Sequence, residues 1–162
     1  MSRLLSIGLV ALLLGMTGST AFAQSAGQPR ENSASVRDRF IGAWRLAWLE
    51  EEEPDGKVRR ADCTGILVFT RDGHISVQVM YRNPQTGTAT GPVQYAAGGY
   101  EASFGTYAIN EGTNTFTYHV EGALVRTLVG KDLTRVFELS GKQLIVKSPD
   151  FNEHWRAAWE HD

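Results

Sequence analysis

The chain has 162 residues, a formal net charge of −2 and one cysteine, Cys63. This length suits one domain with a sizeable core, and the nearly balanced charge excludes the clustered basic face that nucleic-acid binding requires. A single cysteine cannot form an internal disulfide, so the fold must rest on its apolar core, in which we expect Cys63 to be buried.

The first 23 residues are typical of a secretory signal peptide. Arg3 precedes an apolar run over residues 4–14 that is too short to span a bilayer, and Ala21 and Ala23 frame a cleavage site before Gln24. We therefore expect a periplasmic or secreted protein without stable membrane insertion.

Residues 24–38 are mostly polar and are predicted to form a flexible leader, so the domain is predicted to span residues 39–162. A short helical turn over residues 36–40 is predicted to plug one end of this domain. The four glutamates at 50–53 are interpreted as a solvated loop.

Beyond residue 40, apolar residues recur with period two and turn residues arrive at the spacing of antiparallel strands. Asp72-Gly73 is the strongest hairpin signal, because both residues of that turn must tolerate positive φ. The predicted strands are residues 42–50, 64–70, 74–81, 103–109, 115–121, 133–139, 143–147 and 154–160.

These eight short antiparallel strands have no long helix to cover a sheet face. A closed up-and-down barrel leaves no sheet edge and is therefore the predicted all-β fold, with a sandwich as the alternative. The long segment 83–100 between the third and fourth strands is interpreted either as a lid over the barrel mouth or as an irregular loop.

Tryptophans at equal spacing favour closure between the first and last strands. Trp44 and Trp48 share one face of the first strand, and Trp155 and Trp159 share one face of the last. An antiparallel pairing that sets Trp44 opposite Trp159 also sets Trp48 opposite Trp155. We predict that pairing, with two tryptophan pairs in separate parts of the core as the alternative.

Several segments together resemble the lipocalin-like domain found in many bacterial and fungal proteins. They are the Gly42-Ala43-Trp44 opening, "GILVFTRDGHISVQV" (65–79), "FGTYAINEGTNTFTYHVEG" (104–122) and "RVFELSGKQLIV" (135–146), and the resemblance covers roughly residues 40–160. It implies a calycin-type eight-stranded barrel with a central cavity for a small apolar molecule.

Alternation places one arginine inside this barrel. Arg135 shares its strand face with Leu133, Phe137 and Leu139, and a buried guanidinium must be compensated. It is interpreted either as an anchor for a ligand carboxylate or as a structural group, in an internal salt bridge or over Trp44. The predicted ligand-binding residues are Arg135, Trp48, Val77, Val79, Tyr81, Tyr100, Phe137 and Trp155.

The predicted function is therefore binding of a small apolar or amphipathic molecule, with no cofactor. The alternative is an isomerase or cyclase in which His119, Glu121 or Tyr107 moves a proton. Alternation places His119 and Glu121 outside, whereas an inward orientation would let Glu121 pair with Arg135. No catalytic set is complete, and the other histidines are too scattered to predict a metal site.

Overall fold

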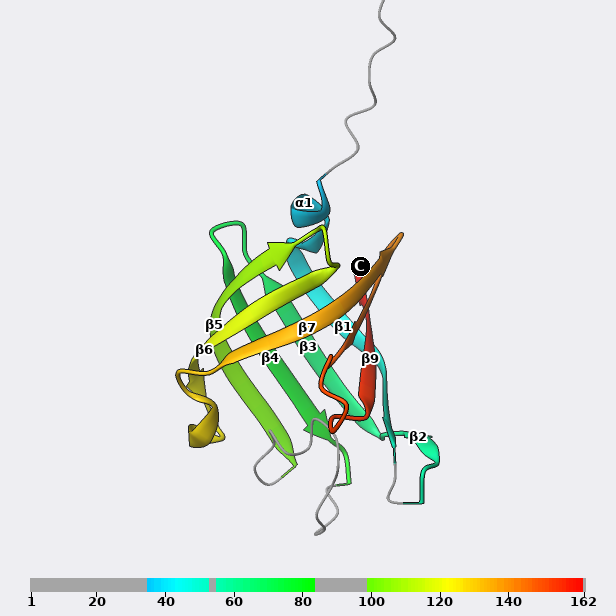
Figure 1. The fold of residues 1–162 in the computed structure, drawn as a ribbon. Coiled ribbons are helices and arrows are strands. Elements are labelled where there is room, and N and C mark those ends of the chain that lie inside the picture. Colours follow the sequence, from blue (N-terminus) through cyan, green and yellow to red (C-terminus); the bar gives the residue numbers. More distant parts are fainter. Residues whose placement is uncertain (1–34, 53–54, 84–98, 162) are drawn as a thin grey trace, which may run out of the picture. The chain divides into compact units, whose positions relative to one another are not determined.

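The computed structural model describes residues 35–52, 55–83 and 99–161, all within the unit Ser33–Asp162. Its elements are α1 (Val36–Phe40), β1 (Gly42–Glu52), β2 (Val58–Arg60), β3 (Cys63–Phe69), β4 (His74–Tyr81), β5 (Tyr100–Asn110), β6 (Thr115–Ala123), the 3-10 turn η2 (Arg126–Leu128), β7 (Asp132–Ser140), β8 (Gln143–Lys147) and β9 (Trp155–His161) (Figure 1). The predicted signal peptide and most of the predicted leader and lid lie outside the described residues. Within those residues, no helix is long and apolar enough to cross a membrane.

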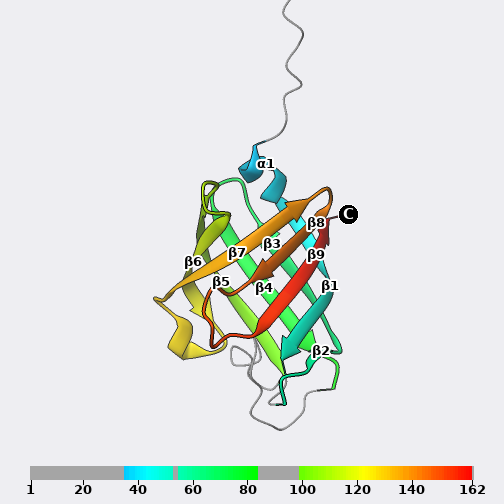
Figure 2. The same cartoon turned by 45° about the vertical axis from the view of Figure 1, so that its right-hand side comes forward.

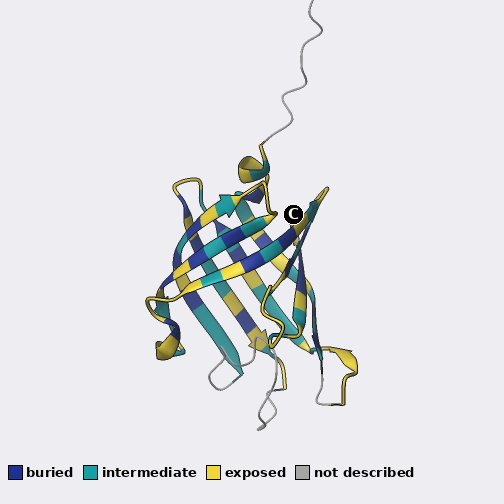
Figure 3. Cartoon of the chain, viewed as in Figure 1, coloured by how far each residue is buried: buried dark blue, intermediate teal, exposed yellow. Residues whose placement is uncertain are grey.

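Eight antiparallel strands form a closed barrel, as predicted. The hydrogen-bonded order runs β1-β3-β4-β5-β6-β7-β8-β9, and β9 pairs with β1 to close the sheet (Figure 2). The sequence did not predict the ninth strand, β2, whose three exposed residues pair with the end of β1. Burial alternates along the barrel strands, as expected when one face of each strand is inside (Figure 3).

The predicted closing strands are confirmed, but the predicted register is wrong. Trp44 lies opposite His161, and Leu46 lies opposite Trp159. A β-bulge then places Trp48 opposite Ala158, so that Ala47 is the extra residue. This insertion reverses the alternation of β1, because a slip of one residue exchanges the two faces of a strand.

The first glycine of β1 permits close contact with the last residue of β9. Gly42 has a φ of 131°, and a Cβ atom built there would lie 2.3 Å from His161 Nε2. The Trp44 ring packs edge-on against the His161 ring at a centroid distance of 4.9 Å. Glycine at this position therefore supports the strand closure.

The predicted helical turn is confirmed as α1, which closes one end of the barrel. Phe40 is 0% exposed and packs edge-on against Phe69, Phe116 and Phe137, at centroid distances of 5.0, 6.0 and 4.8 Å. Trp44 Nε1 donates a 2.7 Å hydrogen bond to the Phe40 carbonyl. Aromatic packing therefore fills this end, called the closed end below.

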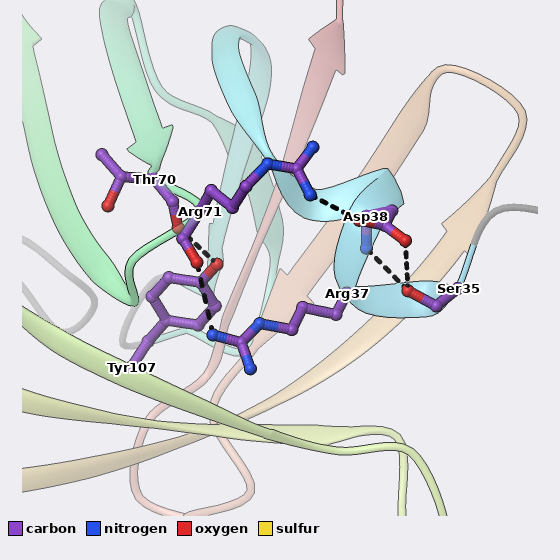
Figure 4. A network of polar contacts seen from close by, with 6 residues as sticks. All are labelled: Ser35, Arg37, Asp38, Thr70, Arg71 and Tyr107. Atoms are coloured by element: carbon purple, nitrogen blue, oxygen red, sulfur yellow. Dashed lines mark hydrogen bonds and ion pairs between the residues drawn. The ribbon is translucent and has the colours of Figure 1, made fainter.

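Polar contacts fasten α1 to the turn between β3 and β4 (Figure 4). Arg71 Nη1 forms a 3.0 Å ion pair with Asp38, whose side chain accepts a hydrogen bond from the Ser35 hydroxyl. Arg37 donates to the Arg71 carbonyl at 3.4 Å, and the Tyr107 hydroxyl donates to the Thr70 carbonyl at 2.9 Å. Hydrogen bonds to Ser35 and Arg71 hold the pKa of Asp38 below its ordinary value.

Candidate functional site

The interior of the barrel holds a cavity of about 70 Å³. Its wall is mostly apolar and comes from all eight barrel strands and η2. Four of the lining residues carry an ionisable or hydroxyl group. The lining residues are Leu46, Leu49, Leu67, Ile75, Val77, Val79, Glu101, Ser103, Phe116, Tyr118, Leu128, Leu133, Arg135, Val146, Trp155, Ala157 and Trp159. The polar groups are those of Glu101, Ser103, Tyr118 and Arg135.

Arg135 points into the barrel and is 8% exposed, as the alternation of its strand predicts. Its Nη1 lies 3.6 Å from Glu153 Oε2 and donates a 3.0 Å hydrogen bond to the Thr134 carbonyl. Its guanidinium carbon lies 5.3 Å from the centre of the Trp155 ring, and Trp155 Nε1 donates to Glu153 at 3.2 Å. Arg135 is thus part of an internal salt bridge stacked on an aromatic ring, one of the two roles considered for it.

Glu101 brings a carboxyl group to the cavity wall. Burial raises its pKa to about 7, although the nearby charge of Arg135 and a hydrogen bond with Ser103 act in the opposite direction. In an apolar barrel the desolvation of the charged form outweighs both interactions. Glu101 is therefore poised to exist in both protonation states near neutral pH.

Tyr118 is 4% exposed, and its side chain contributes to the cavity wall. The Ser103 side chain lies within hydrogen-bonding reach of the Tyr118 hydroxyl. Burial raises the pKa of Tyr118 to about 12, so the phenol remains a hydrogen-bond donor at neutral pH.

At the end away from α1, Glu51 is 8% exposed and accepts a 2.8 Å hydrogen bond from the Tyr81 hydroxyl. Burial raises the pKa of the Glu51 carboxyl above its ordinary value. It also raises the pKa of the half-buried Cys63 thiol, to about 11. The interpretation of residues 50–53 as a solvated loop is wrong for Glu50, Glu51 and Glu52, which belong to β1. Since thiolate is the reactive form, Cys63 is a poor nucleophile at neutral pH.

The predicted ligand-binding residues are distributed over four locations: the cavity, the end away from α1, the closed end and the outside of the barrel. Arg135, Val77, Val79 and Trp155 line the cavity, and Tyr81 makes its hydrogen bond to Glu51 at the end away from α1. Phe137 belongs to the aromatic packing around Phe40 at the closed end, and it does not line the cavity.

Trp48 and Tyr100 lie on the outside. The expectation that Trp48 points inward is wrong, because the bulge at Ala47 turns it out of the barrel. Its ring lies 5.4 Å from the guanidinium carbons of both Arg60 and Arg156, and Glu50 forms ion pairs with these same arginines. Tyr100 donates a 2.9 Å hydrogen bond to the exposed Gln78.

The residues considered for catalysis do not converge. His119 lies on the outer surface with its Nδ1 2.7 Å from Asp132, and Glu121 is exposed as the extra residue of a second bulge. Glu121 therefore does not pair with Arg135, whose carboxylate partner is Glu153. The Tyr107 hydroxyl is bound to the Thr70 carbonyl at the closed end. The described part of the chain contains no cluster of three metal-ligating side chains.

Sequence reasoning missed Glu101, Ser103 and Tyr118 as cavity residues. Tyr118 carried a usable signal, because alternation put it on the same inward face as Phe116 and Val120. Glu101 carried no such signal, because the predicted strand began at residue 103, whereas β5 begins at Tyr100. The earlier start of β5 brings Glu101 and Ser103 onto one inward face.

Comparison with known proteins agrees with this architecture. The profile of the family described as "lipocalin-like domain" matches residues 41–161, which include all the barrel strands. A comparison with curated protein sequences gives no match. The chain belongs to the lipocalin-like domain family.

Proposed function

We propose that this protein binds a small, mostly apolar molecule inside the barrel. The cavity inside the barrel, with its apolar wall, is the observation that carries the proposal. Such walls hold ligands by removing apolar area from water, at roughly 25 cal/mol per Å². A cavity of about 70 Å³ has less than half the volume of the roughly 150 Å³ cavities that hold benzene, so the ligand has only a few heavy atoms.

Binding is better supported than the isomerase or cyclase alternative. His119 and Glu121 lie on the outer surface of β6, and the Tyr107 hydroxyl is engaged at the closed end. General acid–base catalysis requires the transferring group within hydrogen-bonding reach of the substrate. These three residues do not meet that requirement for a ligand in the cavity.

Xenon under pressure tests the proposal, because it enters apolar cavities without polar contacts. We expect saturable shifts of the amide signals of cavity-lining residues in a ¹⁵N–¹H correlation spectrum. Ala157→Val fills the cavity from β9 and should remove these shifts, whereas Ala108→Val makes the same change on the exposed face of β5 and should keep them. Wild-type protein without saturable shifts at the lining residues would contradict the proposal.

We further propose that the protein acts after export, in the periplasm or outside the cell. The support is the sequence of residues 1–23, with its short apolar run and the Ala21-Phe22-Ala23 cleavage site. Protein recovered from a secreting host should begin at Gln24, as measured by intact mass. Recovery from the cytoplasm with residues 1–23 attached would contradict it.

A further inference from the structure

The turn that joins β6 to β7 presents apolar side chains to water. Leu124 is 49% exposed and Val129 is 44% exposed, and the Phe104 ring beside them on β5 is 57% exposed. The backbone of this turn is well held, because the Leu124 and Gly130 amides donate hydrogen bonds of 2.8 and 2.7 Å to carbonyls of β5 and β6. The fold therefore keeps these apolar groups at the surface, which is typical of a site that contacts a partner.

The three exposed side chains border an open groove of about 460 Å³ on the outer surface of β4, β5 and β6. Ala102, Gly122 and Ala123 contribute small apolar groups to its wall, and its two charged residues are Glu121 and Arg126. The outer surface thus combines an apolar recess with a cation on the same turn.

Arg126 and Lys131 make this turn positively charged. No acidic residue occurs in the chain between Glu121 and Asp132, and the Asp132 carboxylate already lies 2.7 Å from His119 Nδ1. Within the described residues, neither Arg126 nor Lys131 forms an ion pair, whereas the cations of β8 and β9 at the same end of the barrel do. Two cations beside exposed apolar groups are complementary to an anionic surface.

A membrane with anionic lipids fits both features of the turn. Segments that bind such membranes place apolar side chains at the boundary of head groups and acyl chains, and place lysine and arginine among the head groups. A stable protein interface would need roughly 800 Å² on this side, with anchors buried at its centre. The exposed apolar groups instead lie on and beside a small turn, and Figure 1 shows η2 beyond the ends of β6 and β7, away from α1.

We propose that the turn over residues 124–131 docks the protein on the surface of a membrane that contains anionic phospholipids. The exposed apolar side chains enter the boundary between head groups and acyl chains, while Arg126 and Lys131 meet the lipid phosphates. This inference goes beyond ligand binding in the barrel and does not depend on it. Leu128 of the same turn is 7% exposed and lines the cavity, so docking brings one part of the cavity wall next to the lipid.

Cosedimentation with lipid vesicles tests the docking. The protein used begins at Gln24, because the apolar run at residues 4–14 would itself bind lipid. Wild type should bind vesicles that contain about 30% phosphatidylglycerol about 25-fold more tightly than pure phosphatidylcholine vesicles, since each of the two cations contributes about fivefold near an anionic surface. Raising the salt from about 0.1 to about 1 M should remove this preference.

Charge reversal locates the cations that matter. Arg126→Glu combined with Lys131→Glu should abolish the preference for phosphatidylglycerol. Arg39→Glu combined with Lys142→Glu makes the same change of charge at exposed positions of the closed end and should keep the preference.

Polar substitutions locate the apolar contact in the same way. Leu124→Ser combined with Val129→Ser should weaken binding to both kinds of vesicle at least about tenfold, because less apolar area leaves water. Val58→Ser combined with Ile66→Ser removes exposed apolar groups of β2 and β3 and should not weaken it. All four side chains are exposed, so both variants should unfold at the same urea concentration as wild type.

Three results would overturn the inference: wild type that binds neither kind of vesicle, wild type that binds both equally, or equal losses in the variants of the turn and their controls. A wild-type dimer that Leu124→Ser with Val129→Ser dissociates, without vesicle binding, would assign the surface to a second copy of the chain instead. The xenon shifts of the cavity-lining residues are measured without lipid, so failure of the docking leaves the proposed function standing.

Discussion

Glu101→Gln should make the protein more stable at neutral and higher pH, and this gain should disappear in acid. The pKa of Glu101 is raised from 4.5 to about 7 by burial. Below pH 4.5 the carboxyl group is protonated in both the folded and the unfolded chain, so its ionisation contributes nothing to the pH dependence. Between pH 4.5 and 7 the unfolded chain releases this proton while the folded chain retains it, so stability falls as the pH rises.

The size of this effect follows from the two pKa values. Each unit of difference corresponds to 1.36 kcal/mol, so the ionisation of Glu101 costs about 3 kcal/mol of stability once the pH exceeds about 7. Glutamine resembles the protonated acid and does not titrate. The free energy of unfolding of the variant, minus that of wild type, should therefore rise by about 3 kcal/mol from pH 4.5 to about 7 and then level off.

Urea unfolding followed by tryptophan fluorescence measures this difference at each pH. Glu50→Gln is the matched control, because hydrogen bonds and ion pairs with Arg156 and Arg60 lower the pKa of Glu50. The Glu50 carboxylate stabilises the folded chain, and this contribution is lost in acid. The free energy of unfolding of Glu50→Gln minus that of wild type should therefore fall as the pH rises. A Glu101→Gln difference that is the same at all pH values would refute the argument that Glu101 is desolvated within the barrel.

Four further substitutions test the packing by the same unfolding measurement. Arg135→Met leaves the mostly buried Glu153 carboxylate without its cation and should lower the free energy of unfolding by about 3–5 kcal/mol. A loss below about 1 kcal/mol would show that Glu153 does not depend on Arg135 for its burial. Phe40→Ala should lower the free energy of unfolding by about 3–5 kcal/mol, because this ring is 0% exposed. Trp48→Ala should lower it by about 1 kcal/mol, because Trp48 makes surface contacts with arginines. Equal losses would contradict the outward position of Trp48. Gly105→Ala should lower stability by about 1–3 kcal/mol or more, because its Cβ atom would lie 1.9 Å from the His119 carbonyl oxygen; a neutral substitution would mean that β5 and β6 are not packed so closely.

Much of the barrel was predictable because its determinants are local. Period-two alternation and turn residues such as Asp72-Gly73 identified the eight barrel strands to within a few residues, and the strand count predicted closure. The inward position of Arg135 followed from three apolar residues on the same face. The structure agrees with these sequence patterns because alternation of apolar and polar residues is the direct consequence of a strand with one buried face.

Features that depend on contacts between strands were not predictable in the same way. β2 has three exposed residues without apolar alternation, and it exists through its pairing with the end of β1. Glu51 has the sequence neighbours of a solvated acidic run, yet Tyr81 from β4 supplies the hydrogen bond that permits its burial. In both cases the stabilising partner is distant in sequence, and local composition does not reveal it.

The bulge at Ala47 connects this unpredicted geometry to the cavity. Without it, strict alternation would continue the inward face of Trp44 and Leu46 with Trp48, a large side chain directed into an interior that eight strands make only wide enough for side chains. The extra residue instead turns Leu49 inward, where it lines the cavity, and places Trp48 outside between Arg60 and Arg156. The space beside Arg135 and Tyr118 therefore depends on one inserted residue in β1, which exchanges an inward tryptophan for a smaller leucine.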